Sequence, residues 1–212
     1  MDTAVGVVKT YLELCGYFVL AEVPVRTAAG SAGAGYRDAT DLDILAVRFP
    51  HPPLAAPRRV TRPLEVFLGA DPALDDFEHG VDVIVGEVKE GQARLNPALR
   101  RAETVAFALR RLGCCPEAQV EAEARAVAER GAQEMAMPGR VPCRVRLVAF
   151  GGTGVAGKRG VRTVPLAHCV AFVRARLRDS RDVLAGAQFK DPVLALYALE
   201  DKLAGGAPPI GA

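Results

Sequence analysis

Two apolar segments of the chain carry charged side chains that could do chemistry. Residues 41–47 (DLDILAV) and 81–89 (VDVIVGEVK) are rich in apolar and β-branched residues, so each predicts a buried strand. Charges are costly inside such strands unless they pair or bind something. Glu87 and Lys89 are two residues apart and therefore point to one face, where Asp43 of the other strand could join them. Two carboxylates and an ammonium at a sheet edge can hold a hard divalent cation and orient a water, which is the chemistry of phosphodiester hydrolysis.

The elements that must position these residues follow from the periodicity of the sequence. Apolar runs predict strands over residues 17–26, 41–49, 64–68, 81–89, 141–150 and 161–165. Helical spacing predicts helices over residues 3–15, 72–79, 97–112, 117–135, 166–178 and 191–203. Three successive strands can form an antiparallel meander, and a helical crossover then brings in the next strand as a parallel neighbour. We therefore expect an α/β fold with a mixed central sheet flanked by helices.

Length and composition indicate one domain. The chain has 212 residues, of which 50% are hydrophobic and 25% charged, as in ordinary globular proteins. We expect a single domain over residues 1–204, with its core in about residues 1–150, a helical addition in about 161–204 and a flexible tail in 205–212. The formal net charge of +2 does not by itself indicate a nucleic-acid binder, although arginines late in the chain could form a local basic surface.

The five cysteines and the absence of long apolar runs predict a cytoplasmic protein without a membrane partner. The cysteine number is odd and the spacings fit no zinc pattern, so reduced thiols are expected. We find no signal-peptide pattern and no apolar run of transmembrane length.

The order of elements, together with these residues, resembles the PD-(D/E)XK nuclease superfamily, which has the restriction-endonuclease-like αβββαβ core. In that family the second strand supplies an aspartate, matched here by Asp43, and the third ends in acidic-x-Lys, matched by Glu87-Val88-Lys89. The start of the chain, LELCGYFV at residues 12–19, looks like the helix-Gly-aromatic-strand entry of archaeal Holliday-junction resolvases and their bacterial relatives. The resemblance covers about residues 1–112 and extends to the strand at 143–150.

This resemblance implies a Mg²⁺- or Mn²⁺-dependent nuclease, with DNA as the expected substrate. Asp43 and Glu87 would ligate the metal, assisted by the Val88 carbonyl, and Lys89 would orient the attacking water or stabilise its deprotonated form. The family's acidic residue in the first helix has two candidates, Asp2 and Glu13, and the alternative for Glu13 is a surface ion pair with Lys9. Endo- versus exonucleolytic cleavage stays open, and cutting both strands would favour a symmetric homodimer.

Several alternatives stay open beside this reading of the residues. The central trio could be only a strand-end salt bridge. Asp41 could be a second acidic ligand or could mark the strand entry, and Gln92 and Glu90 could line the site or belong to a polar turn.

The glycine-rich residues 152–158 (GTGVAGK) fit a phosphate-loop pattern, but Arg159 stands where Ser or Thr is needed. A flexible hairpin is the favoured structure, and its Lys158 and Arg159 could still contact nucleic-acid phosphates. The alternative function is a catalytically inactive protein of the same fold that acts as a structural or nucleic-acid-binding assembly subunit.

Overall fold

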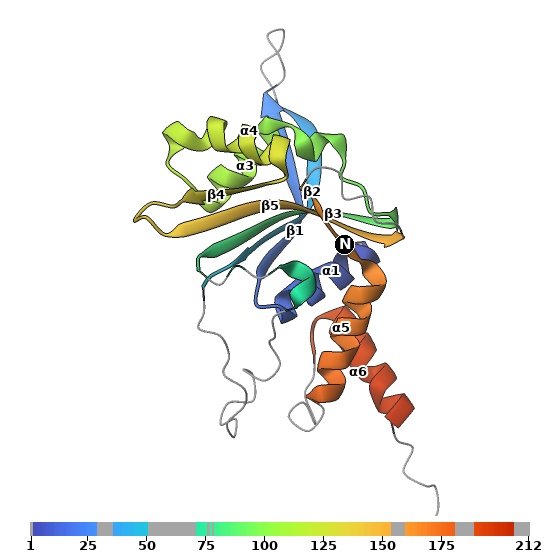
Figure 1. The fold of residues 1–212 in the computed structure, drawn as a ribbon. Helices are drawn as coiled ribbons and strands as arrows, with labels where there is room; N and C mark the ends of the chain where they lie inside the picture. The colour runs from blue at the N-terminus through green and yellow to red at the C-terminus, as the bar shows by residue number, and fades with distance from the viewer. Residues whose placement is uncertain are drawn as a thin grey trace, which may run out of the picture.

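A mixed β-sheet forms the centre of the molecule (Figure 1). The computed structural model describes residues 2–28, 36–50, 71–75, 77, 79–153, 160–180 and 189–205. Within these residues six strands share one sheet in the order β1-β2-β3-β5-β4, and β6 pairs with the later half of β5. The strands are β1 (Phe18–Ala28), β2 (Tyr36–Arg48), β3 (Val81–Gln92), β4 (Ala132–Ala136), β5 (Pro142–Thr153) and β6 (Arg162–Pro165).

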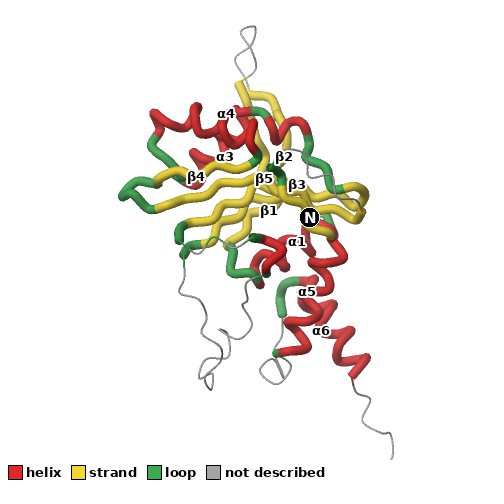
Figure 2. Tube along the Cα trace, viewed as in Figure 1, coloured by secondary structure: helices red, strands yellow, loops and turns green. Residues whose placement is uncertain are grey.

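Helices cover both faces of this sheet (Figure 2). The α-helices are α1 (Thr3–Leu14), α3 (Ala102–Leu112), α4 (Val120–Arg130), α5 (Leu166–Asp179) and α6 (Pro192–Gly205). Three 3₁₀ turns accompany them in the described residues: η1 (Pro72–Leu74), η2 (Pro97–Arg100) and η3 (Glu117–Gln119). The expected α/β class with a mixed sheet flanked by helices is confirmed.

The strand connections follow the order predicted from the sequence. β1, β2 and β3 form an antiparallel meander, and β5 then lies parallel to β3 after the crossover through α3 and α4. The crossover explains how a strand distant in sequence becomes the neighbour of β3.

Three predicted elements differ from the structure. The helix expected over 117–135 ends at Arg130, because Gly131 takes a left-handed φ of 83°, and the chain then forms β4 against β5. The helix expected over 97–112 is interrupted at Arg101, whose extended backbone separates η2 from α3. The helix expected over 72–79 is only η1, which stops at Asp75 with a φ of 55°. The strand predicted for 64–68 and the tail after residue 205 lie outside the described residues.

Two hydrophobic clusters lie on opposite faces of the sheet. One is built from α3, α4 and the sheet side chains beneath them, and includes Leu99, Leu109 and Leu147. The other is built from α1, α5 and α6, and includes Tyr11 and Phe150. Figure 1 shows α3 and α4 above the sheet, and α1, α5 and α6 below it. Because β3 is covered on both faces, every residue from Val81 to Val88 is buried, and six of these eight are apolar or glycine.

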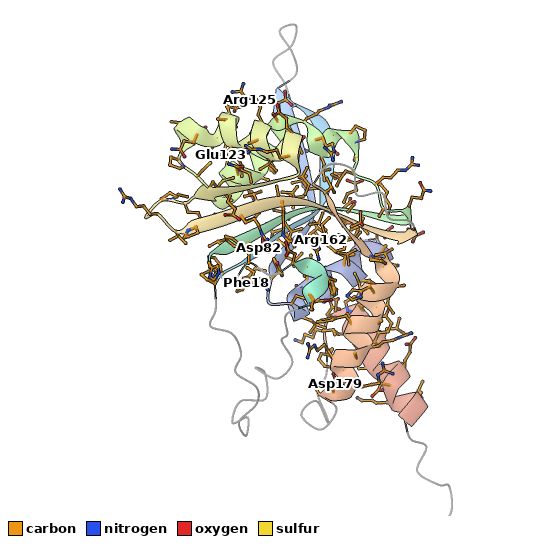
Figure 3. The ribbon with its side chains drawn as sticks, viewed as in Figure 1. Phe18, Asp82, Glu123, Arg125, Arg162 and Asp179 are labelled. Atoms are coloured by element: carbon orange, nitrogen blue, oxygen red, sulfur yellow. The ribbon has the colours of Figure 1, made fainter. Side chains whose placement is uncertain are left out.

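A buried charge cluster stabilises the start of β3. Asp82 is fully buried, accepts from Tyr17 Oη at 2.6 Å and is bonded by Arg146 Nη2 at 2.7 Å and by Arg144 Nε at 3.1 Å. Burial alone would raise the pKa of Asp82, but the charge and hydrogen bonds of Arg146, followed by those of Arg144 and Tyr17, lower it. Figure 3 shows this region beside η1, near Arg162. Asp82 therefore links β3 to β5 and to the residue Tyr17 before β1.

No helix in the described part of the chain is long and apolar enough to cross a membrane.

Candidate functional site

The end of the β2–β3 ladder brings Asp43 and Glu87 together. The paired part of the two strands ends with Ile44 opposite Gly86, so Asp43 and Glu87 are the next residue on each strand. There the carboxylate of Asp43, rather than a backbone carbonyl, accepts the N–H of Val88, with 2.8 Å between Oδ2 and N. Asp43 is close enough for its charge to act on both Glu87 and Lys89. The structure therefore places the predicted trio on one side of the sheet.

Glu87 is a buried carboxylate that is only half satisfied. Its side chain is 2% exposed, and its Oε1 lies 2.5 Å from the ammonium of Lys89. Its Oε2 is buried and has no hydrogen-bond partner among the described residues. Burial raises the pKa of Glu87, the charge of Asp43 raises it further, and Lys89 and the backbone N–H of Asn96 oppose these effects. The net shift is upward, as expected for a carboxylate whose counter-charge is incomplete.

Lys89 is the cation of the trio. Its side chain is about half exposed at 49%, and hydrogen bonding to Glu87, with the charges of Glu87 and Asp43, raises its pKa. The lysine therefore stays protonated at neutral pH and acts as a positive charge rather than as a base. The two carboxylates and one ammonium carry a formal net charge of −1, which leaves room for a further cation.

An open cleft of about 620 Å³ adjoins this trio. Its lining runs along the chain from Lys89 through Gln92 and Arg94 to Pro97. Gln92 is exposed at the last position of β3, opposite Thr153 of β5, so it lies at the cleft as expected for a residue near the site.

The glycines that follow the apolar part of β5 allow its backbone to approach the cleft closely. A Cβ added to Gly152 would lie 2.1 Å from the carbonyl oxygen of Glu90, and one added to Gly151 would lie 2.5 Å from the backbone N of Ala93. Both distances are far shorter than any real Cβ contact, so only glycine fits at these positions. These glycines explain part of the glycine-rich stretch without a phosphate loop.

Asp41 does not mark the entry of its strand. β2 already begins at Tyr36, so Asp41 is an exposed residue in the strand interior, opposite Pro24. The simple alternation that would place it beside Asp43 is also interrupted. Leu42 and Leu45 belong to the same hydrophobic cluster although they are three residues apart, and Ile44 belongs to the other cluster. Asp43 thus lies at the point where the regular alternation of β2 side chains between the two faces of the sheet is interrupted.

Glu13 is not brought to the trio. It lies on α1, where its carboxylate is 2.8 Å from the ammonium of Lys9, which also bonds to Asp191 at 3.3 Å. The surface ion pair that was the alternative for Glu13 is the arrangement observed, and α1 packs on the face of the sheet opposite α3 and α4. In this structure Glu13 is thus engaged by Lys9, and its role as a metal ligand stays a prediction.

Sequence reasoning missed two residues near the site. Glu22 of β1 lies opposite Asp43 of β2, because the flanking pairs are Ala21–Ile44 and Val23–Leu42. Its backbone has a positive φ of 54°. An acidic residue inside an apolar strand was the available signal for it. Asn96, whose N–H acts on Glu87, caps η2 through its side chain, and the Asn-Pro pair was the signal for that cap.

No group of three or more His, Cys, Asp or Glu side chains suited to a metal occurs in the described ranges. Any cation at the trio would therefore depend on two carboxylates, a backbone oxygen and water. Lys158 and Arg159 fall in residues 154–159, outside the described part. The residues after Gly160 form β6 rather than the helix that a phosphate-binding loop needs.

Comparisons with protein-family models, with curated proteins and with solved structures gave no significant match.

Proposed function

We propose that this protein is a metal-dependent nuclease that hydrolyses phosphodiester bonds of nucleic acid, with DNA as the expected substrate. The observation that carries the proposal is the convergence of Asp43, Glu87 and Lys89 at the end of one ladder, with the buried Oε2 of Glu87 left without a partner in the described structure. The meander followed by a parallel strand also supports membership of the PD-(D/E)XK superfamily, because it is the connectivity of that family's core.

The side chains at the trio fit a Mg²⁺ or Mn²⁺ ion. Carboxylate oxygens are the ligands that hard cations prefer, and Mg²⁺ commonly binds through one or two carboxylates while keeping several waters. A cation beside Oε2 of Glu87 would satisfy an atom that otherwise carries an uncompensated desolvation cost. Asp43 and Glu87 would hold the ion, with the Val88 carbonyl as a third oxygen.

Each residue then has a defined task. The bound ion would polarise the scissile phosphate and lower the pKa of a water. Lys89, which stays protonated because its pKa is raised, would orient that water and stabilise the negative charge that develops during attack. The bond from the Val88 N–H would hold the Asp43 carboxylate in place.

Cleavage of DNA in the presence of Mg²⁺ or Mn²⁺ tests the proposal. Duplex, single-stranded and branched DNA would be incubated with wild type, with Lys89→Ala and with Lys202→Ala as a control, because Lys202 is an exposed lysine on α6. We expect metal-dependent cutting that Lys89→Ala lowers by about 100-fold or more and that Lys202→Ala leaves unchanged. Cutting that survives Lys89→Ala would assign it to another site or to a contaminant.

A non-catalytic protein of the same fold is the second candidate. The observation that favours it is the closed ion pair between Lys89 and Glu87, which is also what a purely structural strand-end salt bridge would look like. The low net charge of +2 points the same way. Wild-type protein that cuts none of the substrates in either metal would favour this candidate.

A further inference from the structure

Arg94 is an arginine of the cleft whose side chain has no partner among the residues that the structure describes. It lines the same cleft as Lys89 and is exposed. None of the hydrogen bonds, ion pairs or ring contacts between the described residues involves its side chain. Several other arginines are committed to partners: Arg110 to Glu117, Arg144 and Arg146 to Asp82, Arg162 to the backbone of η1, and Arg174 to Glu200.

The backbone that carries Arg94 is held firmly on both sides. Ala93 is 3% exposed and lies so close to Gly151 that no Cβ would fit between them. Leu95 packs against the hydrophobic cluster beneath α3 and α4, and the side chain of Asn96 caps η2 through the N–H of Ala98. The Cα of Arg94 is therefore fixed relative to β3 and β5, and only the side chain extends into open space.

A fixed arginine with unused donors suits recognition of a phosphate. The guanidinium presents a planar set of N–H donors that matches the oxygens of a phosphate in a bidentate arrangement. Lys89 belongs to both the trio and the lining of the cleft, and its ammonium is paired with Glu87. Apart from Lys89, the lining holds one cationic side chain, Arg94, and one acidic side chain, Glu90. Arg94 is therefore the cation of the cleft that the trio does not use.

We propose that Arg94 binds a backbone phosphate of the nucleic-acid substrate, adjacent to the phosphate that is cut, and so fixes the strand in the cleft. This inference rests on the proposed nuclease function, since it deepens the description of the same site. Arg94 contributes to holding the substrate, while Asp43, Glu87 and Lys89 carry the chemistry.

Binding of fluorescein-labelled DNA, as duplex and as single strand, tests this role by anisotropy with EDTA present so that no cleavage occurs. The variants are Arg94→Ala, Arg94→Lys and Arg178→Ala; Arg178 is a matched control because it is exposed, has no partner among the described residues and lies on α5. Arg94→Ala should weaken binding about tenfold near 0.1 M salt and lower the slope of log Kd against log salt by about 1. Arg94→Lys should recover the slope but only part of the affinity, and Arg178→Ala should stay within about twofold of wild type.

Equal losses for Arg94→Ala and Arg178→Ala would overturn the inference, as would wild-type protein that binds neither DNA. The kinetics separate it from the proposed function. In Mn²⁺, Arg94→Ala should raise KM and leave kcat close to the wild-type value. If wild type cuts DNA and Arg94→Ala leaves KM unchanged, the role of Arg94 is refuted while the proposed nuclease function stands. If DNA binding depends on Arg94 but wild type does not cut DNA, the nuclease function is refuted while the phosphate contact of Arg94 stands.

Discussion

Replacement of Glu87 by Gln should make the metal-free protein more stable and remove its stabilisation by metal. Glu87 is a buried carboxylate whose Oε2 has no partner in the described structure and whose pKa is raised chiefly by burial. A neutral amide of the same shape removes the cost of burying that charge. It also removes one of the two carboxylates that the nuclease proposal assigns to the cation.

The magnitude follows from the charge that the substitution removes. The amide still buries one polar atom without a partner, so the gain is only the extra cost of burying an ionised oxygen instead of a neutral one, roughly 2 kcal/mol. The ion pair that Gln would lose is with Lys89, which is about half exposed and so contributes only about 0–1 kcal/mol. The net gain is about 1–2 kcal/mol, which for a chain of this length raises Tm by about 2–8 °C. Because the pKa of Glu87 is raised above its ordinary value of 4.5, the gain is largest above the folded pKa and vanishes in acid, where both side chains are neutral.

Thermal unfolding of wild type, Glu87→Gln and Glu90→Gln with and without Mn²⁺ measures both effects. Glu90 is a fair control because it is an exposed glutamate of the same strand end and cleft. Mn²⁺ at tenfold excess over its Kd should stabilise wild type and Glu90→Gln by about 1.4 kcal/mol, or about 3–6 °C, and should not stabilise Glu87→Gln. A metal-free Glu87→Gln protein that melts below wild type at neutral pH, or that gains as much from Mn²⁺ as wild type, would refute the reasoning.

Three further predictions concern the scaffold around the site. Gly151→Ala should destabilise the fold by about 1–3 kcal/mol, measured by urea unfolding, because the new Cβ would meet the backbone of Ala93; an unchanged midpoint would contradict this close approach. Asp82→Asn should lower the free energy of unfolding by about 3–5 kcal/mol, because it leaves Arg144 and Arg146 without their buried carboxylate. Asp75→Asn is the control: Asp75 is an exposed partner of Arg144, and its loss should cost less than about 1 kcal/mol. Equal costs for the two variants would argue against the buried cluster. The stabilisation from Asp82 is complete above its ordinary pKa of 3.8 and is lost as pH falls through its lowered folded pKa, so stability should fall less steeply below about pH 4 in Asp82→Asn than in wild type.

The sequence could predict the centre of the site because strand patterning is a local property. Apolar runs located β2 and β3 and put Glu87 and Lys89 on one face through their spacing of two. The meander then made Asp43 a neighbour of that face, as the bond from Val88 to Asp43 shows. The resulting three-residue cluster needed no tertiary information beyond the strand order.

The remaining differences arise from effects that local patterns do not contain. β4 has a composition of Ala, Gln, Glu and Met that is compatible with a helix, and its extended form depends on Gly131 and on pairing with β5. Simple alternation of side chains does not hold at Asp41, because the buried side chains of β1 and β2 switch from one face of the sheet to the other near Glu22. Glu22 has a positive φ, and no glycine in the sequence signals this irregularity. The fixed position of Arg94 depends on Gly151, which lies more than 50 residues later in the sequence.

Titration calorimetry with Mn²⁺ on wild type, Asp43→Ala, Glu87→Ala and Glu90→Ala most directly tests whether Asp43 and Glu87 hold one catalytic cation. One ion per chain should bind wild type and Glu90→Ala with the same affinity, and binding at this stoichiometry should be lost in both Asp43→Ala and Glu87→Ala. Binding that persists unchanged in Glu87→Ala, or wild-type protein that binds no Mn²⁺, would contradict the account.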